Sequence, residues 1–153
     1  MPDLRYDSLD KVSIRSVSSG KYLDGRGPTD SEVYITDRDP KAGDIYLHWH
    51  IELMQGGKYA FRSVSSGKYL DGRNSDDAMK DGALLVTDRK PDNDPYLQWT
   101  IEKQDGNIVR LRSLSSDLFI DGRDPANGPN TVWLSPGERP ASDQYYNWII
   151  ETL

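Results

Sequence analysis

The eleven-residue stretch SVSSGKYLDGR occupies residues 16–26 and recurs unchanged at residues 63–73. A diverged third copy, SLSSDLFIDGR, occupies residues 113–123. Each copy is followed by a second shared block (YLHWHIE, YLQWTIE and YYNWIIE), so the whole pattern repeats about every 50 residues. Self-similarity at a fixed period indicates an architecture built from equal units. We therefore predict one domain over residues 1–153, with repeats at about 10–56, 57–106 and 107–153.

Apolar and polar residues alternate within each repeat, which is the pattern of a half-buried β-strand. Leu47, Trp49 and Ile51 fall on one face of a predicted strand, and His48 and His50 fall on the other. The runs KYL and VYIT and their counterparts add further strands, and Ser-Ser-Gly, Asp-Gly-Arg and Asp-Pro segments separate them. The pattern predicts an all-β protein with about four short strands per repeat.

Three such units cannot each bury an apolar face alone, so they must share one core. A closed barrel with a triangular cap meets this requirement. We therefore predict a β-trefoil with pseudo-threefold symmetry. Trp49, Trp99 and Trp148 recur in phase with isoleucine in the fourth strand of each repeat, and they are predicted to lie in the core.

Composition narrows the functional classes. The 153-residue chain has a formal net charge of −6 and no cysteine. An acidic surface argues against nucleic-acid partners, and no apolar run approaches the ~20 residues of a membrane span, so no membrane insertion is expected. The lack of cysteine and of an N-terminal signal pattern favours a cytoplasmic protein, with release by a non-classical route left open. A homodimer is also left open.

Catalytic and metal chemistry find little support in the sequence. The two histidines, His48 and His50, share one strand face, and their spacing supplies no third metal ligand. A cysteine nucleophile, a Gly-Xaa-Ser-Xaa-Gly elbow and a phosphate-binding loop are all missing from the sequence. We therefore predict a protein that is not an enzyme, with no metal and no cofactor.

The GKYL segment, a third strand and a closing aromatic-Ile-Glu strand resemble the β-trefoil superfamily over the whole chain. Within it, the repeats look like those of ricin-B-like and of fungal and invertebrate trefoil lectins, and they are also similar to fascin and hisactophilin. The QxW motif of ricin-B modules is not kept, because Gln98 lies directly beside Trp99. The resemblance implies a carbohydrate-binding protein, with glycans or glycoproteins as partners. It also implies galactose or N-acetylgalactosamine as the sugar.

In such lectins each repeat carries one shallow site, between the end of the second strand and the loop around the third. The resemblance therefore implies up to three sites. Tyrosines that precede the fourth strands in repeats one and two are added as stacking surfaces. The predicted ligand-binding residues are Asp24, Gly25, Arg26, Asp37 and Tyr46 in repeat one, Asp71, Gly72, Arg73, Asp88 and Tyr96 in repeat two, and Asp121, Gly122 and Arg123 in repeat three.

These residue types suit a sugar, because a carboxylate accepts from two hydroxyls and a guanidinium donates to ring or hydroxyl oxygens. A structural alternative stands beside this interpretation, since Asp-Gly is itself a strong turn pattern and the arginines of the triplets could form internal ion pairs. The third repeat has diverged: Asp117 replaces the glycine of the other repeats, and Pro136 stands where Asp37 and Asp88 stand. It is expected to bind weakly.

Two other functions remain as alternatives. The similarity to fascin and hisactophilin suggests actin bundling, which normally calls for a basic or histidine-rich surface that this acidic chain lacks. A trefoil protease inhibitor would use one long exposed loop, such as residues 73–82 or 123–130. The near-identity of the repeats favours several equal sites over one special loop.

Overall fold

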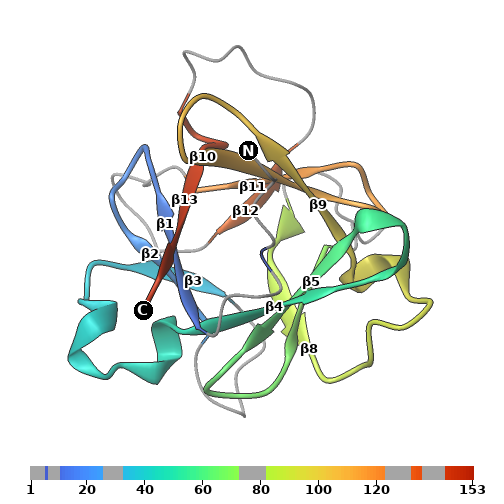
Figure 1. Ribbon diagram of the computed structural model, residues 1–153, viewed down its shortest axis with the longest axis horizontal. Helices are drawn as coiled ribbons and strands as arrows, with labels where there is room; N and C mark the ends of the chain where they lie inside the picture. Colours follow the sequence, from blue (N-terminus) through green and yellow to red (C-terminus); the bar gives the residue numbers. More distant parts are fainter. Residues whose placement is uncertain (1–5, 7–10, 26–32, 73–81, 123–131, 136–143) are drawn as a thin grey trace.

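The protein is described by a computed structural model that covers residue 6 and residues 11–25, 33–72, 82–122, 132–135 and 144–153. Three lobes surround a common centre, and each lobe corresponds to one sequence repeat (Figure 1). Among these residues the secondary structure consists of strands and short 3-10 turns. In the described part of the chain, no helix has the length and apolar character required to cross a membrane.

Six antiparallel strands close into a barrel, because each pairs with a neighbour on both sides and the last pairs with the first. Repeat one supplies the first two of them and each later repeat supplies two more (Figure 1). The strands, in ring order, are β1 (Val12–Ser16), β4 (Trp49–Leu53), β5 (Tyr59–Ser63), β9 (Trp99–Lys103), β10 (Ile108–Ser113) and β13 (Trp148–Thr152).

Three hairpins, one from each repeat, complete the fold. They are β2 (Tyr22–Asp24) with β3 (Tyr34–Thr36), β6 (Tyr69–Asp71) with β8 (Leu85–Thr87), and β11 (Phe119–Asp121) with β12 (Trp133–Ser135). The two-residue strand β7 (Gly82–Ala83) pairs with β12 and so joins two hairpins. A six-stranded barrel with three hairpins is the β-trefoil, and the predicted fold is confirmed.

Short 3-10 turns lie in the loops that lead to and from the barrel strands. They are η2 (Pro40–Ala42), η3 (Ile45–Leu47), η4 (Gln55–Gly57) and η5 (Pro95–Leu97). The turns η3 and η5 directly precede β4 and β9, so they set the position of the residue just before each of these strands.

The core is organised around three tryptophans that are fully buried, as predicted from their phase with isoleucine. Each indole N–H also needs a hydrogen-bond partner in this apolar setting. It finds one in the second strand of its own repeat: Trp49 donates to the Leu23 carbonyl at 3.2 Å, Trp99 to Leu70 at 3.3 Å and Trp148 to Ile120 at 3.0 Å. The tryptophans therefore fasten the hairpins to the barrel.

The Asp-Gly turns lie where two repeats meet. A Cβ atom on Gly72 would lie 2.6 Å from the Ser113 hydroxyl and 2.8 Å from the Trp99 ring. Ser113, which begins the SxSS segment of the next repeat, donates to the Gly72 carbonyl at 3.2 Å. A Cβ atom added to Gly25 or to Gly122 would likewise lie close to a serine and a tryptophan. Much of the eleven-residue identity is therefore explained by this joint between repeats.

Candidate functional site

The three predicted aspartates end the second strands of their repeats, and all of them are buried. Asp24 and Asp121 are 0% exposed and Asp71 is 4% exposed. A carboxylate without accessible surface cannot accept a hydrogen bond from a ligand in this conformation. The expectation that these carboxylates face solvent and contact sugar is therefore corrected: they lie beneath the surface and support it.

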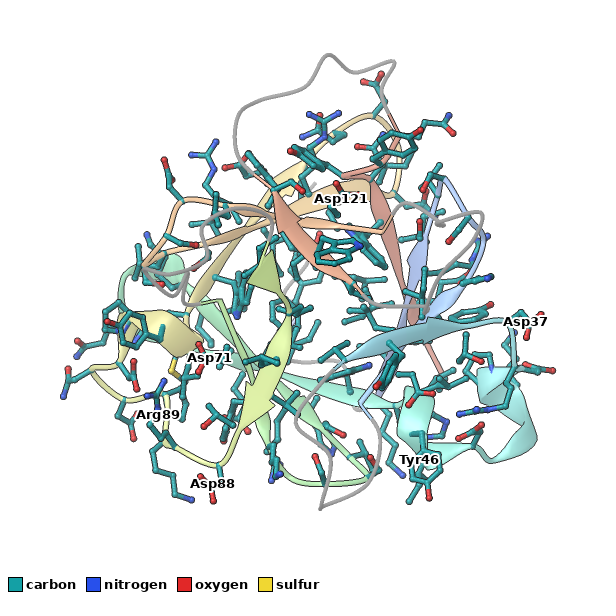
Figure 2. All side chains as sticks on the ribbon, turned by 180° about the vertical axis from the view of Figure 1, so that it is seen from behind. Asp37, Tyr46, Asp71, Asp88, Arg89 and Asp121 are labelled. Carbon is teal, nitrogen blue, oxygen red and sulfur yellow. The ribbon has the colours of Figure 1, made fainter. Side chains whose placement is uncertain are left out.

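Two of these carboxylates are paired with arginines from the loop after the third strand. Arg38 Nη2 lies 2.9 Å from Asp24 Oδ2, and Arg89 Nη2 lies 3.0 Å from Asp71 Oδ2. Figure 2 shows Asp71 and Arg89 directed toward one another at the end of their hairpin. The internal bridges anticipated as an alternative thus exist, but Arg38 and Arg89 supply the cation to them.

The arginines predicted to bind ligand, Arg26, Arg73 and Arg123, lie outside the described residues. Gly25 and Gly72 are described, and their backbone N–H groups donate to the carbonyls of Tyr46 and Tyr96, each at 2.8 Å. These bonds tie the second strand to the turn before the fourth strand. The role of these glycines in the structure is therefore to allow close approach of the repeats.

Each arginine contacts a second carboxylate. Arg38 Nε donates to Asp44 Oδ2, and Arg89 Nε lies 3.3 Å from Asp94 Oδ2. The hydrogen bond from Arg38 to Asp44, followed by the charge of Asp24, raises the pKa of the guanidinium against the opposing effect of desolvation. Arg38 therefore stays charged at every pH at which the protein folds.

Asp44 and Asp94 also fix the tyrosines that follow them. Asp44 Oδ1 accepts from the Tyr46 N–H at 3.1 Å, and Asp94 Oδ1 accepts from the Tyr96 N–H at 3.0 Å. An aspartate in this position caps the first turn of a helix, here the single 3-10 turn. One carboxylate thereby positions both the arginine and the tyrosine.

The tyrosine rings are the exposed part of the arrangement. Tyr46 is 43% and Tyr96 is 42% exposed. The Arg38 Cζ atom lies 5.9 Å from the centre of the Tyr46 ring, and the Arg89 Cζ atom lies 5.5 Å from the centre of the Tyr96 ring, within the range of cation–π contacts. We call Arg38, Asp44 and Tyr46 the repeat-one platform, and Arg89, Asp94 and Tyr96 the repeat-two platform.

Asp37 and Asp88, two further predicted site residues, precede the arginines in sequence and are exposed. Figure 2 shows both at the outer edge of their repeats, with Asp88 near Arg89 and Asp37 well away from Tyr46. Both carboxylates are therefore available to solvent, but only Asp88 lies near a platform, and neither is joined to the buried aspartates.

Repeat three is built differently. Tyr145, which corresponds to Tyr46 and Tyr96, is 40% exposed, and its carbonyl accepts from the Gly122 N–H at 3.0 Å. The buried Asp121 carboxylate accepts from the Ser135 hydroxyl at 2.9 Å, and the sequence has Gly137 at the position of Arg38 and Arg89. Pro136, expected to weaken this repeat, lies outside the described residues.

A metal centre finds no support in the described residues, which contain no group of three or more histidines and carboxylates arranged to hold an ion. His48 is half-buried, and its Nε2 lies 2.8 Å from the Pro40 carbonyl oxygen. Gln98 makes the corresponding bond to Pro91 at 2.9 Å. This position therefore fastens the loop that carries each platform.

Sequence reasoning gave Tyr46 and Tyr96 but left Asp44, Asp94 and the two bridging arginines out of the candidate site. A usable pattern was present: Asp-Xaa-Tyr-Leu precedes both Trp49 and Trp99. An aspartate two residues before a tyrosine at the start of a short turn is typical of an N-cap.

The structure is a β-trefoil that carries the same arrangement of aspartate, arginine and exposed tyrosine at two symmetry-related places on its surface. Residues 5–77 and 46–134 match the family described as ricin-type beta-trefoil lectin domain-like. The chain belongs to this family. Membership supports carbohydrate binding as its general function, in a family that is generally non-catalytic. Among curated proteins, none matches the chain in sequence.

Solved structures with the same fold span short proteins and longer enzymes. A designed threefold-symmetric protein, ThreeFoil, is 17% identical with a TM-score of 0.78, and the match covers 94% of this chain and 99% of that one. The Macrolepiota procera ricin B-like lectin, solved with lactose, is 15% identical with a TM-score of 0.75, over 99% of this chain and 100% of that one. An exo-beta-1,3-galactanase from Clostridium thermocellum is 17% identical with a TM-score of 0.77, over 99% of this chain but only 32% of the enzyme.

Proposed function

We propose that the protein is a non-catalytic lectin that binds galactose or N-acetylgalactosamine residues of glycans on the platforms of repeats one and two. The observation that carries the proposal is the recurrence of one arrangement at two symmetry-related places. In each, a buried aspartate and a capping aspartate hold an arginine beside an exposed tyrosine. Internal stability alone does not require the tyrosine ring to stay open to solvent.

The chemistry of the platform suits a sugar. A tyrosine ring offers an apolar surface to the face of a pyranose, and a charged guanidinium donates strong hydrogen bonds to hydroxyl oxygens. The exposed carboxylate of Asp88 lies near the repeat-two platform and can accept from hydroxyl groups, whereas Asp37 lies away from Tyr46. Because each arginine is held by two carboxylates, little side-chain entropy is lost when a ligand binds.

Galactose-type specificity rests on likeness to other lectins, among them the Macrolepiota procera protein solved with lactose. Each site is open and shallow, so its affinity alone is expected to be weak. Two sites at a fixed separation raise the avidity for a multivalent glycan surface by ~10²–10⁴. Repeat three, whose sequence has Gly137 at the position of Arg38 and Arg89, is expected to contribute less.

A glycan array tests the proposal. The wild-type protein is expected to bind glycans with terminal galactose or N-acetylgalactosamine, and Tyr46→Ala combined with Tyr96→Ala is expected to abolish that signal. Tyr145→Ala is the matched control, because this tyrosine is equally exposed but lies in repeat three, and it should leave the profile unchanged. A double variant with the wild-type profile would refute the platforms as sugar sites.

A further inference from the structure

Repeat one contains a second hollow that is separate from its platform. It has a volume of about 670 Å³, within the ~300–1,000 Å³ range of ligand sites. The first and second strands of repeat one, the turn η2 and the last strand of repeat three form its walls. Figure 1 shows the C-terminal end of β13 beside the segment that carries η2. Its lining residues are Ser13, Arg15, Tyr22, Asp39, Pro40, Lys41, Ile150, Glu151 and Thr152.

In repeat two, the space beside the tyrosine that corresponds to Tyr22 is closed. Tyr69, the counterpart of Tyr22, is 9% exposed and packs with Ala60, Leu97 and Met54. Its hydroxyl donates to Glu52 Oε1 at 2.9 Å. A hollow of about 680 Å³ lies beside Met54 in this repeat, and its lining includes Leu53 and Asp92, the counterparts of Thr152 and Lys41, but neither Tyr69 nor Glu52.

Among the described residues of repeat three, a larger side chain fills the space beside the counterpart of Tyr22. Arg110 stands where repeat one has Ser13, and it is 5% exposed. Its Nε donates to Asn147 Oδ1 at 2.8 Å, and its guanidinium lies over the Tyr146 ring at 6.0 Å. Tyr146 in turn stacks on Phe119, the counterpart of Tyr22, with ring centres 5.0 Å apart.

Repeat one therefore keeps open the space beside Tyr22, whereas described side chains fill the space beside Tyr69 and Phe119. Ser13 is short, and Tyr22 is only half-buried. In the described part of the chain, neither the Tyr22 hydroxyl nor the Lys41 ammonium has a hydrogen-bond or ion-pair partner. These polar groups and the aromatic ring face a hollow that could be filled by one ligand, and repeats two and three supply their own side chains instead.

The charges of the lining indicate the class of ligand. Arg15 and Lys41 balance Asp39 and Glu151, so the lining has no net formal charge. Arg15 Nε lies 3.4 Å from Glu151 Oε1, which sets a donor and an acceptor side by side at the wall. Adjacent donor and acceptor groups match the vicinal hydroxyls of a sugar, and the Tyr22 ring matches its apolar face.

We infer that this hollow is an additional carbohydrate subsite for one neutral sugar residue, with Tyr22 as its stacking surface. The inference rests on the proposed carbohydrate-binding function and adds to it a site whose tyrosine, among the described residues, is left open in repeat one and covered at the corresponding positions of repeats two and three. A glycan antenna could then be held at the platforms and at the hollow independently, because the two kinds of site share no residue.

Amide chemical shifts of the ¹⁵N-labelled Tyr46→Ala/Tyr96→Ala variant, titrated with methyl β-galactoside and methyl β-glucoside, test the inference. Because this variant lacks both platforms, saturable shifts at Ser13, Tyr22, Lys41 and Glu151 are expected for at least one sugar, with a Kd of about 1 mM, a weak affinity equivalent to about −4 kcal/mol. Adding Tyr22→Phe and Lys41→Ala should weaken that binding at least tenfold. Asp92→Ala, at the place of Lys41 in repeat two, should leave it unchanged.

The outcomes separate the hollow from the platforms. Shifts at the platforms of the wild-type protein without saturable shifts at the hollow would overturn the subsite and leave the lectin proposal standing. A response at the hollow with an unchanged Kd in the Tyr22→Phe/Lys41→Ala protein would also overturn it. Saturation at the hollow alone would support the subsite and count against the platforms.

Discussion

The hydroxyl of Ser113 donates a hydrogen bond of 3.2 Å to the carbonyl of Gly72, which belongs to the preceding repeat. Ser16 makes the related bond to Gly122 at 3.3 Å, across the junction of the last repeat with the first. The serine and the Asp-Gly glycine that recur in the three repeats therefore contact each other where neighbouring repeats meet. Because this contact is tight, a larger residue at the glycine is expected to lower the stability of the protein.

Gly72→Ala is expected to destabilise the protein by about 1–3 kcal/mol, because the added methyl group overpacks the joint against Ser113 and Trp99. Urea unfolding measures the change. Gly67→Asn is the matched control: Gly67 has a φ of +75° with open space around its Cβ position, and Asp117 adopts a φ of 65° at the same place in repeat three. Asparagine tolerates this left-handed backbone conformation. If Gly67→Asn lowered the free energy of unfolding as much as Gly72→Ala, the explanation would be contradicted.

The pair of Arg89 with the buried Asp71 is expected to show energetic coupling. Arg89→Met removes the cation from a buried carboxylate and should lower the free energy of unfolding by about 1–3 kcal/mol. The same substitution made in the Asp71→Asn variant should lower it clearly less. A double-mutant cycle by chemical denaturation measures the coupling. Additive losses would show that the contact supports neither the fold nor the platform.

Tyr69 gives a prediction on pH. Burial, followed by the hydrogen bond to Glu52, raises the pKa of its hydroxyl from 10.0 to about 12. A raised folded-state pKa means that the unfolded chain loses this proton first, so the stabilisation is complete below pH 10 and is lost as pH rises through 12. Two pKa units correspond to about 2–3 kcal/mol.

Tyr69→Phe removes that titration. Between pH 10 and pH 12, the free energy of unfolding of the wild-type protein is expected to fall by about 2–3 kcal/mol more than that of the variant. Tyr22→Phe serves as control, because Tyr22 has no described counterpart of the bond to Glu52. Parallel pH profiles for wild-type and Tyr69→Phe proteins would contradict the prediction.

The fold was predictable from sequence because its signal is repeated three times. Trp49 and Ile51 alternate with polar neighbours, and the same phase recurs around Trp99 and Trp148. Short strands alone are ambiguous, but three equal units leave few ways to share a core. The 3-10 turns before the fourth strands were not predicted, because a turn of three residues leaves no measurable helical period.

The candidate site was predictable only in part. Tyr46 and Tyr96 were predicted as stacking surfaces because they immediately precede the fourth strands, and the structure leaves both side chains exposed. Asp24 and Asp71 were misjudged as surface groups, since a sequence does not show that an arginine fourteen or more residues later covers a carboxylate at a strand end. Burial of a charge depends on such long-range pairing, which local patterns do not encode.

The most direct test of the platforms is a crystal structure of the protein soaked with methyl β-galactoside. The account predicts a sugar on the exposed face of Tyr46 and another on that of Tyr96, each within hydrogen-bonding distance of Arg38 or Arg89. A structure in which sugar is bound elsewhere while both tyrosine rings stay bare would contradict it.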